Sequence, residues 1–115
     1  MTYATIAEVR AANAAAGFHW FEPDTIRFFR SKIGGRVYGG RYFISSEQYH
    51  DRCSEGYCRR KYTVREACEN GDVSTVGEFQ GYDTFESART AIRELLKAEA
   101  DGLAAIRELL KGSTS

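Results

Sequence analysis

Three runs rich in β-branched and aromatic residues lie within residues 36–82, and they restrict the fold more than any other feature of the chain. Asn70-Gly71 separates the last two of these runs, which span 36–45, 59–67 and 73–82. Asn-Gly in that position is a strong hairpin signal, because a type I′ turn requires positive φ at both central residues. The sequence therefore predicts an antiparallel β-meander over 36–82, with Asn70-Gly71 at a hairpin tip.

Two helical segments are expected before the meander. Thr5 and Glu8 fit a capping box, in which the first cap residue and the third helical residue bond each other's backbone N–H groups. They predict an Ala-rich helix over 5–16. Asp24 is suited to cap a second, shorter segment over 24–33, in which apolar residues recur at helical spacing. Inside the first run of the meander, Gly39-Gly40 predicts a bulge or a close backbone approach.

A long helix is expected at the C-terminus, over 84–111. Asp83 and Glu86 give a capping-box-like signal at its start. The segment AIRELLK occurs twice within it, at an offset of 14 residues, or two heptads. Such an offset returns apolar residues to nearly the same helix face. The helix either continues to residue 111 or breaks near Gly102 into a helical hairpin.

A continuous C-terminal helix is too long to be covered by its own domain. Residues 84–111 would span about 42 Å as a helix, whereas a domain of this size is only about 30 Å across. The second half would then be uncovered, and we expect self-association as a homodimer through Ile106, Leu109 and Leu110. A fold-back at Gly102 is the alternative.

Length and composition indicate an ordered protein with one domain spanning 1–115. Of its 115 residues, 43% are hydrophobic, which is enough for a packed core. We expect an α+β fold, with a three- or four-stranded antiparallel β-meander, an N-terminal helix and a long C-terminal helix packed across the sheet. No apolar run reaches the roughly 18 residues of a membrane helix, and the N-terminus does not resemble a secretory signal. A cytoplasmic protein without membrane association is therefore expected.

Charge is distributed unevenly, although the net charge is zero. Residues 1–65 have an excess of five basic residues, and residues 66–115 have an excess of five acidic ones. Either the two halves attract each other, or the basic half binds an anion or a partner. Cationic side chains hold phosphates and exposed aromatic rings stack on bases. The candidate binding residues are Arg36, Arg41, Arg59, Arg60, Lys61, Arg65, Tyr38 and Tyr62.

Signals for metal binding and catalysis are weak. One histidine and three cysteines supply the side chains of a Cys3His zinc site, namely His50, Cys53, Cys58 and Cys68. Because their spacing contains no CxxC pair, we expect reduced cysteines, no metal and no cofactor. The sequence contains only two histidines and lacks the GxSxG, HExxH and Gly-rich phosphate-loop motifs. We therefore expect a non-enzymatic protein without catalytic residues.

Four motifs in fixed order resemble a family of small proteins encoded by bacteriophages and prophages. They are DTIRFFRS at 24–31, YFISSE at 42–47, YTVR at 62–65 and TVGEFQGY at 75–82. The resemblance covers roughly residues 17–90, and the doubled AIRELLK lies outside it. It implies a short accessory protein, made in an infected bacterial cytoplasm, that acts by binding. The function of the family is unknown, so no site residues follow from it.

Two functions are therefore considered. The first is a non-enzymatic phage accessory protein that acts by binding, as an inhibitor of a host or anti-phage defence factor. The second is a nucleic-acid or nucleotide-binding module that uses the basic and aromatic face of the sheet. A steep salt dependence of oligonucleotide binding would favour the second.

Overall fold

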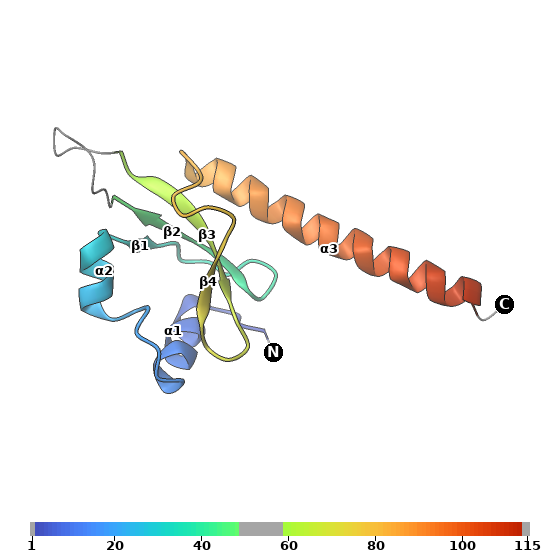
Figure 1. Ribbon diagram of the computed structural model, residues 1–115, viewed down its shortest axis with the longest axis horizontal. Helices are drawn as coiled ribbons and strands as arrows, with labels where there is room; N and C mark the ends of the chain where they lie inside the picture. The colour runs from blue at the N-terminus through green and yellow to red at the C-terminus, as the bar shows by residue number, and fades with distance from the viewer. Residues whose placement is uncertain (1, 49–58, 114–115) are drawn as a thin grey trace.

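The computed structural model describes residues 2–48 and 59–113, with side chains described as far as Leu103. The elements form an α+β fold with a four-stranded antiparallel sheet in the order β1-β2-β3-β4 (Figure 1), which confirms the expected class. In chain order they are α1 (Ile6–Ala15), α2 (Pro23–Phe29), β1 (Lys32–Ile33), β2 (Tyr42–Glu47), β3 (Lys61–Ala67), β4 (Val73–Val76) and α3 (Phe85–Ser113).

The sheet separates two apolar clusters, because successive side chains of a strand point to opposite faces. On one face, Phe43 of β2 packs with Val9 of α1 and with Tyr3. On the other face, Ile44 and the neighbouring Val64 pack against the first turns of α3. The N-terminal helices and α3 thus lie on opposite sides of the sheet.

The N-terminal capping box is confirmed. The Glu8 backbone N–H donates to Thr5 Oγ1 at 3.3 Å, and the Thr5 N–H donates to Glu8 Oε2 at 3.2 Å. α1 follows at Ile6 and ends before Gly17, which has φ of +84°. One buried side chain of α1, Asn13, reaches the sheet: its Nδ2 donates to the Gly71 carbonyl at 2.8 Å.

Asn70-Gly71 lies at the tip of the β3–β4 hairpin, as predicted, but the turn is of another type. The Cys68 N–H donates to the Asp72 carbonyl at 2.9 Å, which encloses a loop of three residues, 69–71. Gly71 has φ of +91°, whereas Asn70 does not have a positive φ. These features match a type I turn followed by a left-handed glycine rather than a type I′ turn.

Two predicted boundaries before β2 are wrong. The segment expected to be helical over 24–33 ends at Phe29, because Arg30 adopts a left-handed conformation with φ of +50°. Lys32–Ile33 instead forms β1, paired with β2. The strand expected over 36–45 begins only at Tyr42, because Gly39-Gly40 forms a turn with positive φ at both residues rather than a bulge.

The last run of the meander is shorter than predicted. β4 ends at Val76, not at residue 82, because Gly77 and Gln80 both have positive φ and turn the chain. The chain returns to the sheet at Tyr82, which pairs with Tyr62. β3 matches its expected range except at the first two residues.

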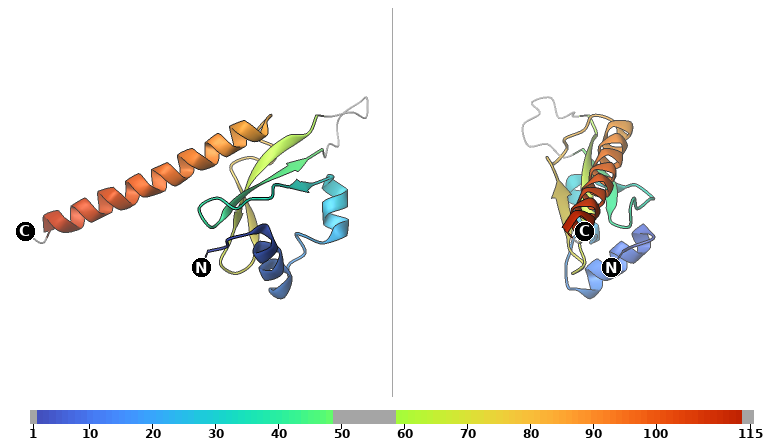
Figure 2. Two further views of the ribbon diagram at one scale, coloured as in Figure 1. Left: turned by 180° about the vertical axis from the view of Figure 1, so that it is seen from behind. Right: turned by 90° about the vertical axis from the view of Figure 1, so that its right-hand side faces the viewer.

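α3 begins at Phe85, one residue later than a cap at Asp83 would place it, and it continues past Gly102. The cap is Thr84, whose Oγ1 accepts the Ser87 N–H at 3.1 Å, so Asp83 and Glu86 do not form the expected box. The helix backbone is continuous to Ser113, which excludes the fold-back alternative. Figures 1 and 2 show its C-terminal part extending away from the sheet, and the molecule measures 65 × 31 × 20 Å. No helix in the described part of the chain meets the length and hydropathy needed to cross a membrane.

Candidate functional site

The candidate basic residues do not form one surface. Arg65 is buried on the sheet face toward α1, whereas Tyr62 lies on the α3 face. The Arg60 Nη1 donates to the carbonyls of Arg30 and Ser46 at 2.8 and 3.0 Å, so this guanidinium links the C-terminal cap of α2 to β2. Arg59 is exposed at the start of the second described segment.

The remaining candidate side chains are held by acidic or aromatic neighbours. Arg41 forms ion pairs with Glu66 and Glu99, and Lys61 Nζ lies 3.5 Å from Asp83 Oδ1. Each of these pairs joins the basic half of the chain to the acidic half, so the two halves do attract each other. The Arg36 guanidinium lies 5.8 Å from the centre of the Tyr38 ring.

A pocket with aromatic walls lies between α2, the sheet and residues 18–22, which follow α1 and which we call the aromatic loop because they contain Phe18, Trp20 and Phe21. Its volume is about 330 Å³. We call it the Arg65 hollow, after the charged side chain in its lining. The residues that line it are Trp20, Thr25, Ile26, Phe29, Ser31, Arg65, Thr75 and Phe79.

Arg65 is fixed in this hollow by hydrogen bonds and by two aromatic rings. Its Nε donates to Ser45 Oγ at 2.9 Å, and its Nη1 donates to Thr75 Oγ1 at 2.5 Å. Its guanidinium carbon lies 5.3 Å from the Trp20 ring centre and 5.5 Å from that of Phe79. Burial lowers the pKa of Arg65, and the nearby carboxylate of Glu47 opposes that shift.

Glu47 supplies the counter-charge for Arg65. It is fully buried, and its Oε2 lies 3.3 Å from Arg65 Nη2. Its Oε1 accepts a hydrogen bond from Thr63 Oγ1 at 2.6 Å. The Gln80 backbone N–H in turn donates to Thr63 Oγ1 at 2.9 Å, which anchors the turn that carries Phe79. The buried pair is therefore net neutral and also positions one wall of the hollow.

The sequence reasoning did not identify most of this constellation. Arg65 was a candidate, but as part of an exposed basic face. Glu47 and Thr75 become its neighbours only through the strand register, which places Arg65 opposite Phe43 and Thr75. Trp20 and Phe79 lie far apart in the chain, and no spacing rule relates them.

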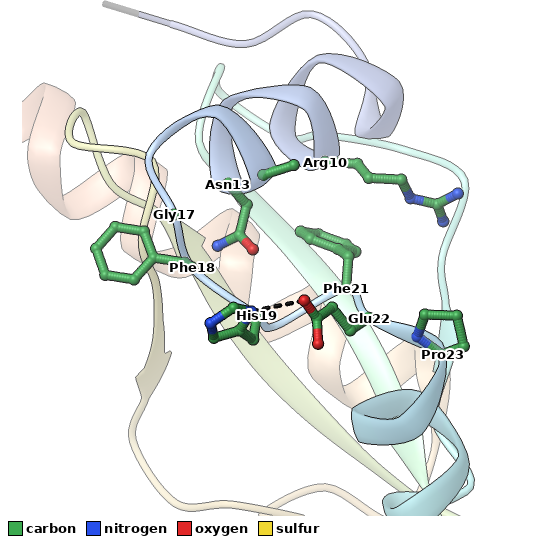
Figure 3. A pocket seen from close by; sticks show the side chains of 9 residues that line it. Arg10, Asn13, Gly17, Phe18, His19, Phe21, Glu22 and Pro23 are labelled. Carbon is green, nitrogen blue, oxygen red and sulfur yellow. Dashed lines mark hydrogen bonds and ion pairs between the residues drawn. The ribbon is translucent and has the colours of Figure 1, made fainter.

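A second hollow lies on the other side of the aromatic loop, between that loop and α1 (Figure 3). Its volume is about 290 Å³, and Arg10, His19, Phe21 and Glu22 are among its lining residues. His19 Nδ1 lies 2.6 Å from Glu22 Oε1, but both side chains are exposed. The Asn13 amide, which points into the same region, is already bonded to the Gly71 carbonyl and to the Trp20 N–H. The described lining contains no Ser, Thr or Cys side chain beside the histidine.

A polar cluster marks the last described contact between α3 and the sheet. The Tyr42 hydroxyl donates to Glu99 Oε1 at 2.6 Å, and Arg41 pairs with the same carboxylate. The hydrogen bond from Tyr42, together with Arg41, lowers the pKa of Glu99 despite partial desolvation. Burial and the same hydrogen bond raise the pKa of Tyr42.

Several candidate residues lie outside the described part of the chain. Of the zinc candidates, His50, Cys53 and Cys58 fall there, and the Cys68 thiol lies 3.7 Å from Ser74 Oγ. Within residues 2–48 and 59–113, no group of three or more His, Cys, Asp and Glu side chains is arranged to hold a metal. The self-association candidates Ile106, Leu109 and Leu110 lie on the described backbone of α3, but their side chains are outside the description.

The architecture is that of a small α+β domain with one projecting helix, and the two hollows described above lie on the side of the sheet toward α1 and α2. The chain belongs to a family of unknown function (DUF7447), whose sequence model matches residues 5–93. The matched region includes the sheet, both hollows and the start of α3, whereas residues 94–115 lie beyond it. No curated protein and no solved structure matches the chain significantly.

Proposed function

We propose that this protein is a non-enzymatic, phage-encoded accessory protein that binds a host or anti-phage defence protein through α3. The phage context rests on the motif resemblance described above. The binding role is supported by one structural observation: α3 leaves the sheet after Glu99 and continues to Ser113 as a projecting helix.

The projecting part of α3 has an apolar stripe. Ile92 is buried against the sheet and Leu96 is half-buried, whereas Leu103, one heptad after Leu96, is 57% exposed. Helical spacing places residues 106 and 110 on the continuation of that stripe. A stripe of this sequence pattern, exposed at Leu103, is suited to pair with an amphipathic helix of another protein. A second copy of the chain has the same stripe, so self-association is expected when no other partner is present.

The non-enzymatic part of the proposal is supported by the arrangement of the charged groups. The buried carboxylate and guanidinium, Glu47 and Arg65, neutralise each other. The His19–Glu22 pair is exposed, and the Thr25 hydroxyl beside His19 donates to its backbone carbonyl at 3.0 Å. Such groups are better placed to hold the fold and a ligand than to transfer protons or attack a substrate.

Affinity capture from bacterial lysate tests the proposal with two matched variants. Leu103→Asp adds a charge to the stripe, and Ala98→Asp adds the same charge to an exposed position of α3 outside it. The intact protein and Ala98→Asp should retain the same host protein, and Leu103→Asp should lose it. Equal capture by both variants would exclude α3 as the binding element.

A further inference from the structure

The Arg65 hollow has no part in the proposed binding through α3. It lies on the sheet face toward α1 and α2, whereas α3 covers the opposite face. Its volume of about 330 Å³ falls at the lower end of the range of small-molecule sites. A pocket of that size suits a single ring system with a small substituent rather than a dinucleotide.

The walls of the hollow favour a flat aromatic ligand. The Arg65 guanidinium carbon lies 5.3 Å from the Trp20 ring centre and 5.5 Å from that of Phe79, and the Phe29 ring centre lies 5.8 Å from that of Phe79. Ile26 adds an aliphatic contact to the lining. Stacking on such rings accepts any flat ring system, whatever its substituents.

The polar groups of the hollow favour a ligand that carries hydrogen-bond acceptors. A guanidinium has five N–H donors, and three of those of Arg65 are used by Ser45, Thr75 and Glu47. Ser31 and Thr75, which each carry a hydroxyl, also line the hollow. A purely apolar ligand would cover these donors without pairing them, which costs free energy.

The charge of the hollow disfavours an anion. Arg65 is the charged residue in the described lining, and Glu47 directly beneath it already balances that charge. A phosphate or carboxylate placed beside Arg65 would also approach the buried Glu47 carboxylate. A neutral ring with acceptor atoms avoids that repulsion.

We propose that the Arg65 hollow binds a neutral, flat heteroaromatic ring with an acceptor edge, the chemical class to which nucleobases belong. The ring packs against the aromatic walls that Trp20 and Phe79 supply, and Arg65 and Thr75 donate to its edge. This site is separate from α3. Ligand binding in the Arg65 hollow can therefore be observed even if α3 binds no protein partner, and α3 can bind a partner even if the hollow binds no ligand.

Trp20 is the single tryptophan of the chain, so its indole signal reports directly on the hollow. We would titrate the ¹⁵N-labelled full chain with adenosine, guanosine, cytidine and uridine and follow the indole N–H resonance. Toluene is the control for a purely apolar ring, and inorganic phosphate is the control for an anion. At least one nucleoside should give a saturable shift, with a Kd at least tenfold lower than that of toluene. Phosphate should give no saturable shift.

Two variants locate the binding, and one controls for surface changes. Phe79→Ala removes an exposed wall, and Thr75→Val removes a hydroxyl at an exposed position. Phe79→Ala should weaken nucleoside binding about tenfold, in line with the loss of one stacking ring. Thr75→Val should weaken it less, and Phe18→Ala, in the other hollow, should leave it unchanged. Thermal unfolding of each variant confirms that it is folded.

Three results would overturn the proposal. The first is no saturable shift with any nucleoside in the millimolar range. The second is toluene or phosphate binding as tightly as the best nucleoside. The third is unchanged binding in folded Phe79→Ala protein.

Discussion

Gly71 occupies a position that tolerates no side chain, for two separable reasons. Its φ of +91° strains any residue with a Cβ, and a Cβ there would lie only 2.6 Å from the Ala12 carbonyl oxygen of α1. Its own carbonyl also accepts the buried Asn13 amide at 2.8 Å. The hairpin tip is thus part of the interface with α1, which explains why the turn departs from the type that Asn70-Gly71 favours in isolation.

Gly71→Ala is expected to destabilise the protein by about 2 kcal/mol or more, the sum of backbone strain and steric overlap. Gly17→Ala is the matched control, since Gly17 has φ of +84° and open space around it. That variant should cost only about 1 kcal/mol, from backbone strain alone. Urea unfolding followed by circular dichroism measures both. Equal losses would contradict the close approach of the hairpin tip to α1.

Among the contacts between helices and strands, the interaction of Glu99 in α3 with Tyr42 and Arg41 depends on pH. Glu99 accepts from Tyr42 and pairs with Arg41, and these groups hold its pKa below the ordinary value of 4.5. A carboxylate with a lowered folded-state pKa stabilises the fold fully above its unfolded pKa, and this contribution is lost as the pH falls through the folded-state value.

Glu99→Gln should therefore lower the melting temperature most above pH 4.5, and the difference from the wild type should shrink as the pH falls below that value. The side chain is 38% exposed, so the effect is expected to be modest and to weaken in high salt. Glu94→Gln, at an exposed position of the same helix, is the control. A melting difference for Glu99→Gln that is constant from pH 3 to pH 7 would argue against the assignment.

The elements that sequence reasoning predicted correctly are those determined by local chemistry. The Thr5–Glu8 box, the β3 strand and the position of the hairpin tip follow from neighbouring residues alone. The wrongly predicted boundaries lie where the backbone conformation of single residues, or tertiary packing, determines where an element ends. Arg30 adopts a positive φ without being glycine, so the end of α2 had no compositional signal, whereas the turn after β4 combines Gly77 with the unsignalled positive φ of Gln80.

The candidate site was predictable only in part, for the same reason. A basic residue in an alternating strand suggests an exposed cation, yet Arg65 is buried because Glu47, Ser45 and Thr75 lie around it in the folded sheet. Those neighbours depend on strand register, and the aromatic walls come from loops that are distant in sequence. The charge asymmetry of the chain was informative, but its main structural expression is ion pairing between the halves.

The molecule has an elongated shape because a compact body of sheet and short helices is joined to one helix that extends beyond it. The body needs only the first turns of α3, since Ala88 and Ile92 are buried in its core and Glu99 makes the last described contact. The rest of the helix contributes nothing to the described core. A free apolar stripe on such a helix is unfavourable in water, and pairing with a second copy removes it with the least new structure.

We therefore expect the purified chain to be a dimer at tens of micromolar, held by α3. Truncation after Ala100 removes the stripe beyond the last sheet contact and should give a folded monomer. Leu103→Asp should also give a monomer, because a carboxylate at a buried position of a helix pair loses its hydration without a partner. Ala98→Asp adds the same charge at an exposed position and should remain dimeric.

Sedimentation equilibrium on the intact chain, the truncation and the two variants measures their oligomeric state directly, with circular dichroism as a check on folding. A monomeric intact chain at that concentration would exclude self-association through Ile106, Leu109 and Leu110, and would leave a different protein as the expected partner of α3.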